Sequence, residues 1–167
     1  MTTNYLDHLF AHPTGLLHVL LSLLALITGT AVLIMRKGTQ AHKRWGYVYF
    51  IAMFGLNFTA LMIYNLFGGW GIFHYAAVIS LTSIALGMVP VLRRKSKGWY
   101  YRHFSFMYWS VMGLYAALAS ELLTRIPDKP FFEMVGIATG AIMLVGGIVF
   151  GMNKKKWTGA LSAKAAQ

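Results

Sequence analysis

Five long runs of apolar residues, separated by short polar or basic stretches, dominate the sequence. A helix needs about 20 apolar residues to cross a hydrocarbon core of roughly 30 Å, and each run is about that long. The pattern therefore predicts an all-α integral membrane protein with a single transmembrane domain and a basic tail at residues 153–167. The predicted helices span about 15–35, 44–67, 72–92, 99–123 and 131–152.

The composition supports lipid as the solvent of these helices. The chain is 57% hydrophobic and only 11% charged, whereas a soluble domain is about 25% charged. So few charges cannot cover a globular surface. The chain has no cysteine, which excludes disulfide exchange, thiolate metal sites and iron–sulfur clusters. No basic segment precedes the first apolar run, so we expect no cleavable signal peptide.

The positive charges lie almost entirely on one side of the predicted membrane. When the loops are assigned to alternating sides, only Arg125 and Lys129 of the 15 Lys and Arg residues fall on the sparsely charged side. The positive-inside rule then places the N-terminus outside and the C-terminus in the cytoplasm of a bacterial cytoplasmic (inner) membrane. We expect the basic loops to contact anionic lipid headgroups, and we expect no nucleic acid as a partner.

The first two helices resemble the third and fourth, which indicates an internal repeat. The first and third apolar runs each open with a Gly-x-x-His pattern that ends at His18 and His74. An apolar run, a basic loop and a further histidine follow in each half, at His42 and His103. Tandem two-helix repeats share an axis along the membrane normal, so we predict a pseudo-two-fold four-helix bundle with the fifth helix added outside. His18 then faces His74 near the outer surface. His42 faces His103 near the cytoplasmic surface.

Positions three and four residues apart extend three of these histidines into stripes of small and polar side chains. Such side chains in membrane helices usually face other helices, so the stripes are predicted to point into the bundle. The stripes contain Ser22, Ala25, Gly29 and Val32 on the first helix, Gly46, Tyr49, Met53, Asn57, Ala60 and Tyr64 on the second, and Met107, Ser110, Leu114, Ala117 and Glu121 on the fourth.

The histidine pairs suit b-type haem. Two imidazoles on facing helices are the usual axial ligands of haem in a helical bundle. One haem between His18 and His74 and another between His42 and His103 would form an electron-transfer path across the membrane. The arrangement is similar to the di-haem transmembrane b-type cytochromes, although those proteins commonly carry two ligands on one helix and this chain carries one on each.

A metal site is the first alternative. Glu121 follows His103 by 18 residues, which is about 27 Å along a helix and places it at the outer end of the fourth helix. There it could join His18 and His74, and two imidazoles with one carboxylate suit zinc or iron(II). Glu121 could instead form an ion pair with Arg125, four residues further along the helix.

Other interpretations need no bound metal or haem. Polar residues inside the predicted helices, among them Asn57, Thr59 and Ser110, could line a path for a proton or solute, or a quinone site. The sequence has no hydrolase elbow, phosphate-binding loop or dinucleotide fingerprint, so no enzyme class is assigned. Glycines spaced four apart on the fifth helix indicate packing faces, through which the chain could form a homodimer or act as a structural accessory subunit of a larger membrane complex. They are Gly136 with Gly140 and Gly147 with Gly151.

Two motifs resemble those of a known family. The segment HKRWGYVY, which begins at His42, resembles the His-Arg-x-x-Gly-Arg-x-Tyr motif of bacterial integral-membrane proteins catalogued as domain of unknown function 2306. The segment HFSFM, which begins at His103, is similar to the later His-Arg-x-x-Met motif of that family, and Arg125 is similar to its downstream Arg. The resemblance covers roughly residues 15–126 and implies a multi-pass membrane fold; the activity of the family is not established.

Overall fold

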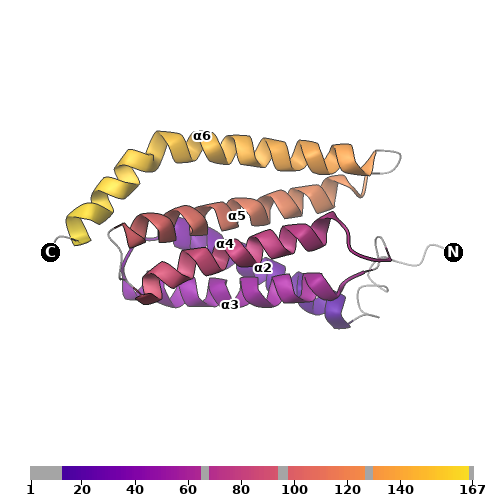
Figure 1. The fold of residues 1–167 in the computed structure, drawn as a ribbon, viewed down its shortest axis with the longest axis horizontal. Helices are drawn as coiled ribbons and strands as arrows, with labels where there is room; N and C mark the ends of the chain where they lie inside the picture. Colours follow the sequence, from indigo (N-terminus) through magenta and orange to yellow (C-terminus); the bar gives the residue numbers. More distant parts are fainter. Residues whose placement is uncertain (1–12, 65–67, 94–97, 127–129, 166–167) are drawn as a thin grey trace. The chain divides into compact units, whose positions relative to one another are not determined.

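The computed structural model describes residues 13–64, 68–93, 98–126 and 130–165, without the side chains of Lys156 and of 158–165. Its regular structure in these ranges is helical throughout (Figure 1). Each helix contains a stretch long and apolar enough to cross a membrane, so the predicted five-helix membrane architecture is confirmed. The helices are α2 (Pro13–Ile34), α3 (Gln40–Met62), α4 (Ile72–Arg93), α5 (Trp99–Leu123) and α6 (Phe131–Ala165).

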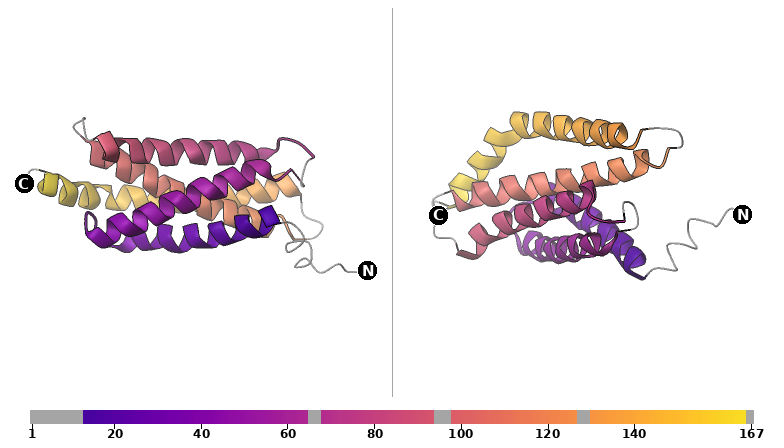
Figure 2. Two further views of the ribbon diagram at one scale, coloured as in Figure 1. Left: turned by 90° about the horizontal axis from the view of Figure 1, so that it is seen from below. Right: turned by 45° about the vertical axis from the view of Figure 1, so that its right-hand side comes forward.

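The chain divides into two compact units, Met1–Ile84 and Ala85–Gln167, and α4 begins in the first and ends in the second. In the first unit α2 and α3 lie side by side (Figure 2). In the second unit α5 packs against α6. The predicted repeat and pseudo-two-fold bundle relate helices of both units and stay predictions.

The beginning of α3 differs from the prediction for a local reason. The helix begins at Gln40, earlier than the predicted 44, because Thr39 caps it. The Thr39 hydroxyl accepts the backbone N–H of His42 at 3.1 Å and donates to the Arg36 carbonyl at 3.0 Å. This satisfies a backbone donor that an uncapped helix leaves exposed. Gly38, with φ of +78°, provides the left-handed turn that precedes the cap.

The other end of α3 also differs from the prediction. The helix ends at Met62, and Ile63 is its extended C-cap residue. The predicted end near 67 falls among residues 65–67, which lie outside the described residues. The helix α3 therefore ends two residues before Tyr64.

Lys37 stabilises the end of α2. Its Nζ donates to the carbonyls of Val32 at 2.7 Å and Leu33 at 2.6 Å. These carbonyls belong to the last turn of the helix, where a cation also interacts favourably with the helix dipole. Burial lowers the pKa of Lys37 below the usual lysine value. This lysine therefore closes the helix as well as adding to the positive charge of its loop.

The predicted stripes are largely buried within their own units. The exceptions are Tyr64, just beyond the end of α3, and the far end of α5, where Ala117 and Glu121 are exposed because the buried face turns towards Ala116 and Ser120. The stripe residues that are buried are Ala25, Gly29 and Val32 on α2, Tyr49, Met53 and Asn57 on α3, and Met107, Ser110 and Leu114 on α5.

The fifth helix continues beyond its predicted end. α6 runs without a break from Phe131 to Ala165, so the predicted tail at 153–167 is helical as far as Ala165. The Tyr108 hydroxyl of α5 donates to the Gly146 carbonyl at 2.8 Å and joins the two helices. Gly136 and Gly140 of α6 have no neighbouring atoms that a methyl group would meet, and oligomerisation through this helix stays a prediction.

Candidate functional site

His74 lies in the first turn of α4 and caps that helix. Its Nδ1 accepts the backbone N–H of Gly71 at 3.1 Å, and its own backbone N–H donates to the Gly71 carbonyl at 3.0 Å. The bond to His74 Nδ1 is the half of a capping box in which the third helical residue reaches back to the backbone N–H of the residue before the helix, and the Gly71 carbonyl accepts in place of the side chain that glycine lacks. The histidine predicted as a ligand therefore has a structural partner.

This cap determines the tautomer of His74. Nδ1 can accept a hydrogen bond only if it carries no proton, so the neutral ring carries its hydrogen on Nε2. His74 is only 4% exposed, and the part of the chain that the structure describes offers its buried Nε2 no hydrogen-bond partner. An unpaired buried donor costs about 1–3 kcal/mol. The Nε2–H of His74 is therefore a buried donor that requires an acceptor from elsewhere.

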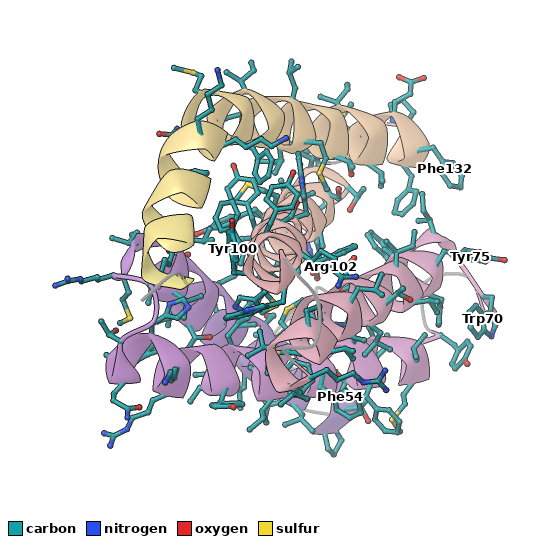
Figure 3. All side chains as sticks on the ribbon, turned by 60° about the vertical axis from the view of Figure 1, so that its left-hand side comes forward. Phe54, Trp70, Tyr75, Tyr100, Arg102 and Phe132 are labelled. Carbon is teal, nitrogen blue, oxygen red and sulfur yellow. The ribbon has the colours of Figure 1, made fainter. Side chains whose placement is uncertain are left out.

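Two aromatic rings pack against the His74 imidazole. The Tyr64 ring lies 4.8 Å from it and the Trp70 ring 5.4 Å from it, centroid to centroid, with interplanar angles of 33° and 32°. Trp70 also contacts Tyr75 edge-on at 5.9 Å, and Figure 3 shows these two side chains together beside the beginning of α4. Tyr64, Trp70 and Tyr75 are each more than 40% exposed. The site therefore combines a buried polar atom with flat apolar surfaces that face outwards.

His18 carries its hydrogen on Nδ1, whereas His74 carries it on Nε2. Its Nδ1 lies 3.0 Å from the Thr59 hydroxyl oxygen, and that hydroxyl donates its one hydrogen to the Leu56 carbonyl at 2.8 Å. Thr59 therefore accepts, His18 donates from Nδ1, and the lone pair of the neutral ring is on Nε2. Metal-bound histidines commonly hold their second N–H on an oxygen in this way.

His18 and His74 lie at the same end of the first unit. Their partners Thr59 and Tyr64 are five residues apart at the C-terminal end of α3. The two histidines nevertheless do not fit a shared haem as they stand. An axial imidazole needs a lone pair directed at the iron, and His74 offers an N–H instead unless it gives up its bond to Gly71.

His103 secures the end of α4 in the second unit. Its Nδ1 lies 2.9 Å from the Gly87 carbonyl, which can only accept, so His103 donates and the lone pair of its neutral ring is on Nε2. Pro90, inside α4, has no N–H, and its ring crowds the carbonyls of the preceding turn. Neighbouring side chains commonly satisfy backbone groups near a membrane-helix proline. His103 therefore has a structural role and also a tautomer suited to ligation.

Glu121, the predicted carboxylate ligand of the metal site, has a partner just beyond the end of its own helix. Glu121 forms an ion pair with Arg125, as the alternative interpretation predicted. No three His, Asp or Glu side chains gather at a metal-binding distance within the described ranges. The metal site of His18, His74 and Glu121 stays a prediction, as does the pairing of His42 with His103.

Several residues that define these environments were not predicted from the sequence. Thr59 was considered only as part of a polar path, and Gly71 and Gly87 contribute backbone atoms that hydropathy cannot distinguish. One signal was available, because the Gly-x-x-His spacing at 71–74 matches the spacing of a capping box. That signal would have predicted a capping role for His74 but would not have revealed the aromatic rings around it.

Five membrane-length helices and polar groups buried within them define a multi-pass integral membrane protein. A family model described as Predicted membrane protein (DUF2306) matches residues 15–153, which is most of the chain. The chain belongs to this family, so the resemblance seen in the sequence is confirmed and extends into α6. No curated protein and no solved structure matches the sequence.

Proposed function

We propose that this protein binds a quinone at the end of the first unit where α3 ends and α4 begins. The carbonyl oxygen of the quinone accepts a hydrogen bond from His74 Nε2. The observation that supports this proposal is the buried Nε2–H of His74, held in that tautomer by Gly71 and provided with no acceptor by the described residues.

The surroundings of His74 favour a flat, membrane-soluble ligand. Tyr64 and Trp70 provide aromatic faces beside the donor, and aromatic rings pack well against a planar ring in an offset or tilted arrangement. Ligand sites of this kind are mostly apolar with a few placed polar groups that orient the ligand. A quinone combines a flat ring, strong carbonyl acceptors and solubility in lipid.

Two substitutions at His74 test the role of its Nε2 separately from that of its Nδ1. In His74→Asn the amide oxygen can accept the Gly71 N–H and keep the cap, but nothing replaces Nε2–H. In His74→Gln the amide N–H can reach the position of Nε2, and glutamine is itself a usual third residue of a capping box. We expect purified wild type to bind a short-chain ubiquinone analogue, His74→Asn to bind it about tenfold more weakly and His74→Gln to retain most of the affinity.

The affinities can be measured by quenching of tryptophan fluorescence or by equilibrium dialysis in detergent. Tyr75→Phe, a change at an exposed ring of the same end, is the matched control and should leave the affinity unchanged. Failure of the wild type to bind, or equal affinity of wild type and His74→Asn, would overturn the proposal. In that case an ordered water is the expected partner of Nε2.

Electron transfer through b-type haem is a second candidate function. It is favoured by the tautomers of His18 and His103, which hold Nδ1–H on an oxygen as haem- and metal-bound histidines commonly do. When bound, haem would supply one-electron chemistry; His18 would hold the iron of a haem in the first unit, and His103 would hold that of another haem in the second unit. The test is the visible absorption spectrum of wild type and of His103→Asn before and after reduction.

We also propose an orientation in the cytoplasmic membrane, with the N-terminus outside and the basic loops among anionic headgroups. The absence of native cysteine makes this easy to test. A cysteine introduced at Gly69 should react with an impermeant maleimide from outside the cell. A cysteine at Asn153 should react only after the membrane is opened, and the reverse pattern would invert the topology.

A further inference from the structure

α6 is longer than a membrane crossing requires. Its 35 residues extend about 52 Å, whereas a hydrocarbon core is roughly 30 Å thick. The membrane-length part ends at Lys155, so the last turns continue past it. Figures 1 and 2 show that α6 changes direction and that its C-terminal part approaches the beginning of α5.

Four aromatic side chains hold this part of α6 against α5, and we call them the aromatic clamp: Phe104, Tyr108, Phe150 and Trp157. The Trp157 ring lies 5.2 Å from Phe104 and 5.9 Å from Tyr108, centroid to centroid. Phe150 stacks on Phe104 at 5.7 Å with an interplanar angle of 13°. Aromatic pairs in this distance range contribute about 0.5–1.5 kcal/mol each beyond their burial. The helix end is therefore attached at a defined place.

The clamp fixes the position of the lysines between its two α6 members. Lys154 and Lys155 are exposed and lie between Phe150 and Trp157 in the sequence. The Nζ of Lys154 lies 5.4 Å from the centre of the Tyr101 ring on α5. Arg102, the next residue on α5, is also exposed, and Figure 3 shows it at the beginning of that helix with Tyr100. Lys154 therefore lies beside an aromatic ring of α5, and Arg102 adds an exposed cation at the beginning of that helix.

We propose that the aromatic clamp presents Lys154 and Lys155 to the phosphate of an anionic phospholipid such as phosphatidylglycerol. The proposal is independent of the quinone site. The net charge of +11 provides the charge complementarity, and each lysine near an anionic bilayer surface contributes favourably to binding. Tyrosine and tryptophan prefer the headgroup level, so the rings place the lysines at the depth of the phosphates.

The experiment compares the affinity for phosphatidylglycerol, measured by native mass spectrometry of protein in neutral detergent. We expect Lys154→Gln with Lys155→Gln to weaken binding about tenfold or more. We expect Trp157→Ala to weaken it several-fold although no charge is removed, because the lysines lose their fixed position. Trp157→Phe keeps a ring in the clamp and should bind nearly as the wild type does.

The matched control removes two charges from another basic region, the α2–α3 connection and the beginning of α3, through Arg36→Gln with Arg44→Gln. Retained affinity in this variant, with loss in the lysine variant, supports the proposal. Equal loss in both variants would overturn it, because general surface charge would then suffice. Unchanged binding by Trp157→Ala, in a variant whose melting temperature in detergent is unchanged, would also overturn it. If the lysine variant lost binding of phosphatidylcholine to the same extent as that of phosphatidylglycerol, the lysines would not recognise the anionic headgroup. If the wild type bound no lipid but bound an acidic peptide, the partner would be a protein.

Discussion

Replacing Gly87 with valine is expected to lower the free energy of unfolding by about 2–3 kcal/mol. A Cβ at this position would lie 2.8 Å from Met107 Sδ and 3.3 Å from Phe106 Cβ. The methionine sulfur can move, but Phe106 Cβ is fixed to the backbone of α5, so the two helices must separate. Small residues allow such close approach in membrane helices, where packing replaces the hydrophobic effect as the main attraction. Gly87→Ala should cost less because it adds only one methyl group.

The control is Gly140→Val, at a position where an added Cβ meets nothing within 4 Å. Both substitutions alter helix propensity equally. The difference between the unfolding free energies of the two variants therefore measures the cost of the clash between α4 and α5. Unfolding by SDS or by heat in the same detergent gives the comparison. Equal destabilisation at the two glycines would contradict the contact argument. A smaller effect at Gly87 than at Gly140 would show that α4 and α5 can separate at little cost.

The second large effect is expected at His103. His103→Ala removes the donor from the Gly87 carbonyl and should cost about 1–3 kcal/mol in unfolding free energy. His103→Asn should recover most of this loss, because its amide N–H occupies nearly the position of Nδ1–H. The same detergent unfolding measurement tests both variants. If alanine and asparagine are equally destabilising, the hydrogen bond to Gly87 is not the source of the effect.

Pro90 provides a second check on the role of His103. Pro90→Ala removes the ring that crowds the turn containing the Gly87 carbonyl, so the His103→Ala substitution should cost less in that background. A double-mutant cycle measures this coupling directly. Additive effects of the two substitutions would show that His103 does not compensate for the proline.

His103→Asn also separates structure from cofactor binding. Asparagine keeps the bond to Gly87 but has no nitrogen in the position of Nε2. If His103 ligates haem, this variant should remain stable and lose the sharp α and β bands of the reduced protein. If the wild type purified with ample haem shows no such bands, the haem proposal fails while the structural role of His103 is unaffected.

Hydropathy predicted the helices well because a segment that crosses a bilayer has few possible backbone structures. Backbone groups in lipid must be paired within the segment, so a run such as 99–123 has to be helical, and α5 has these bounds. The errors came from features that hydropathy does not record. Thr39 begins α3 early through one hydroxyl, and α6 continues beyond 152 into a lysine-rich segment that Trp157 attaches to α5.

The sequence by itself determined that this is a five-helix membrane protein and that His18, His42, His74 and His103 lie near helix ends. The chemistry of His18 and His103 was decided by the tertiary structure, whereas that of His74 was decided by a local contact. His18 donates from Nδ1 because Thr59 of another helix accepts, and His103 does so because Gly87 of α4 accepts. His74 carries its hydrogen on Nε2 because the Gly71 backbone occupies Nδ1. A ring with two nitrogens takes its tautomer from its neighbours, and residue spacing does not specify neighbours that lie on another helix.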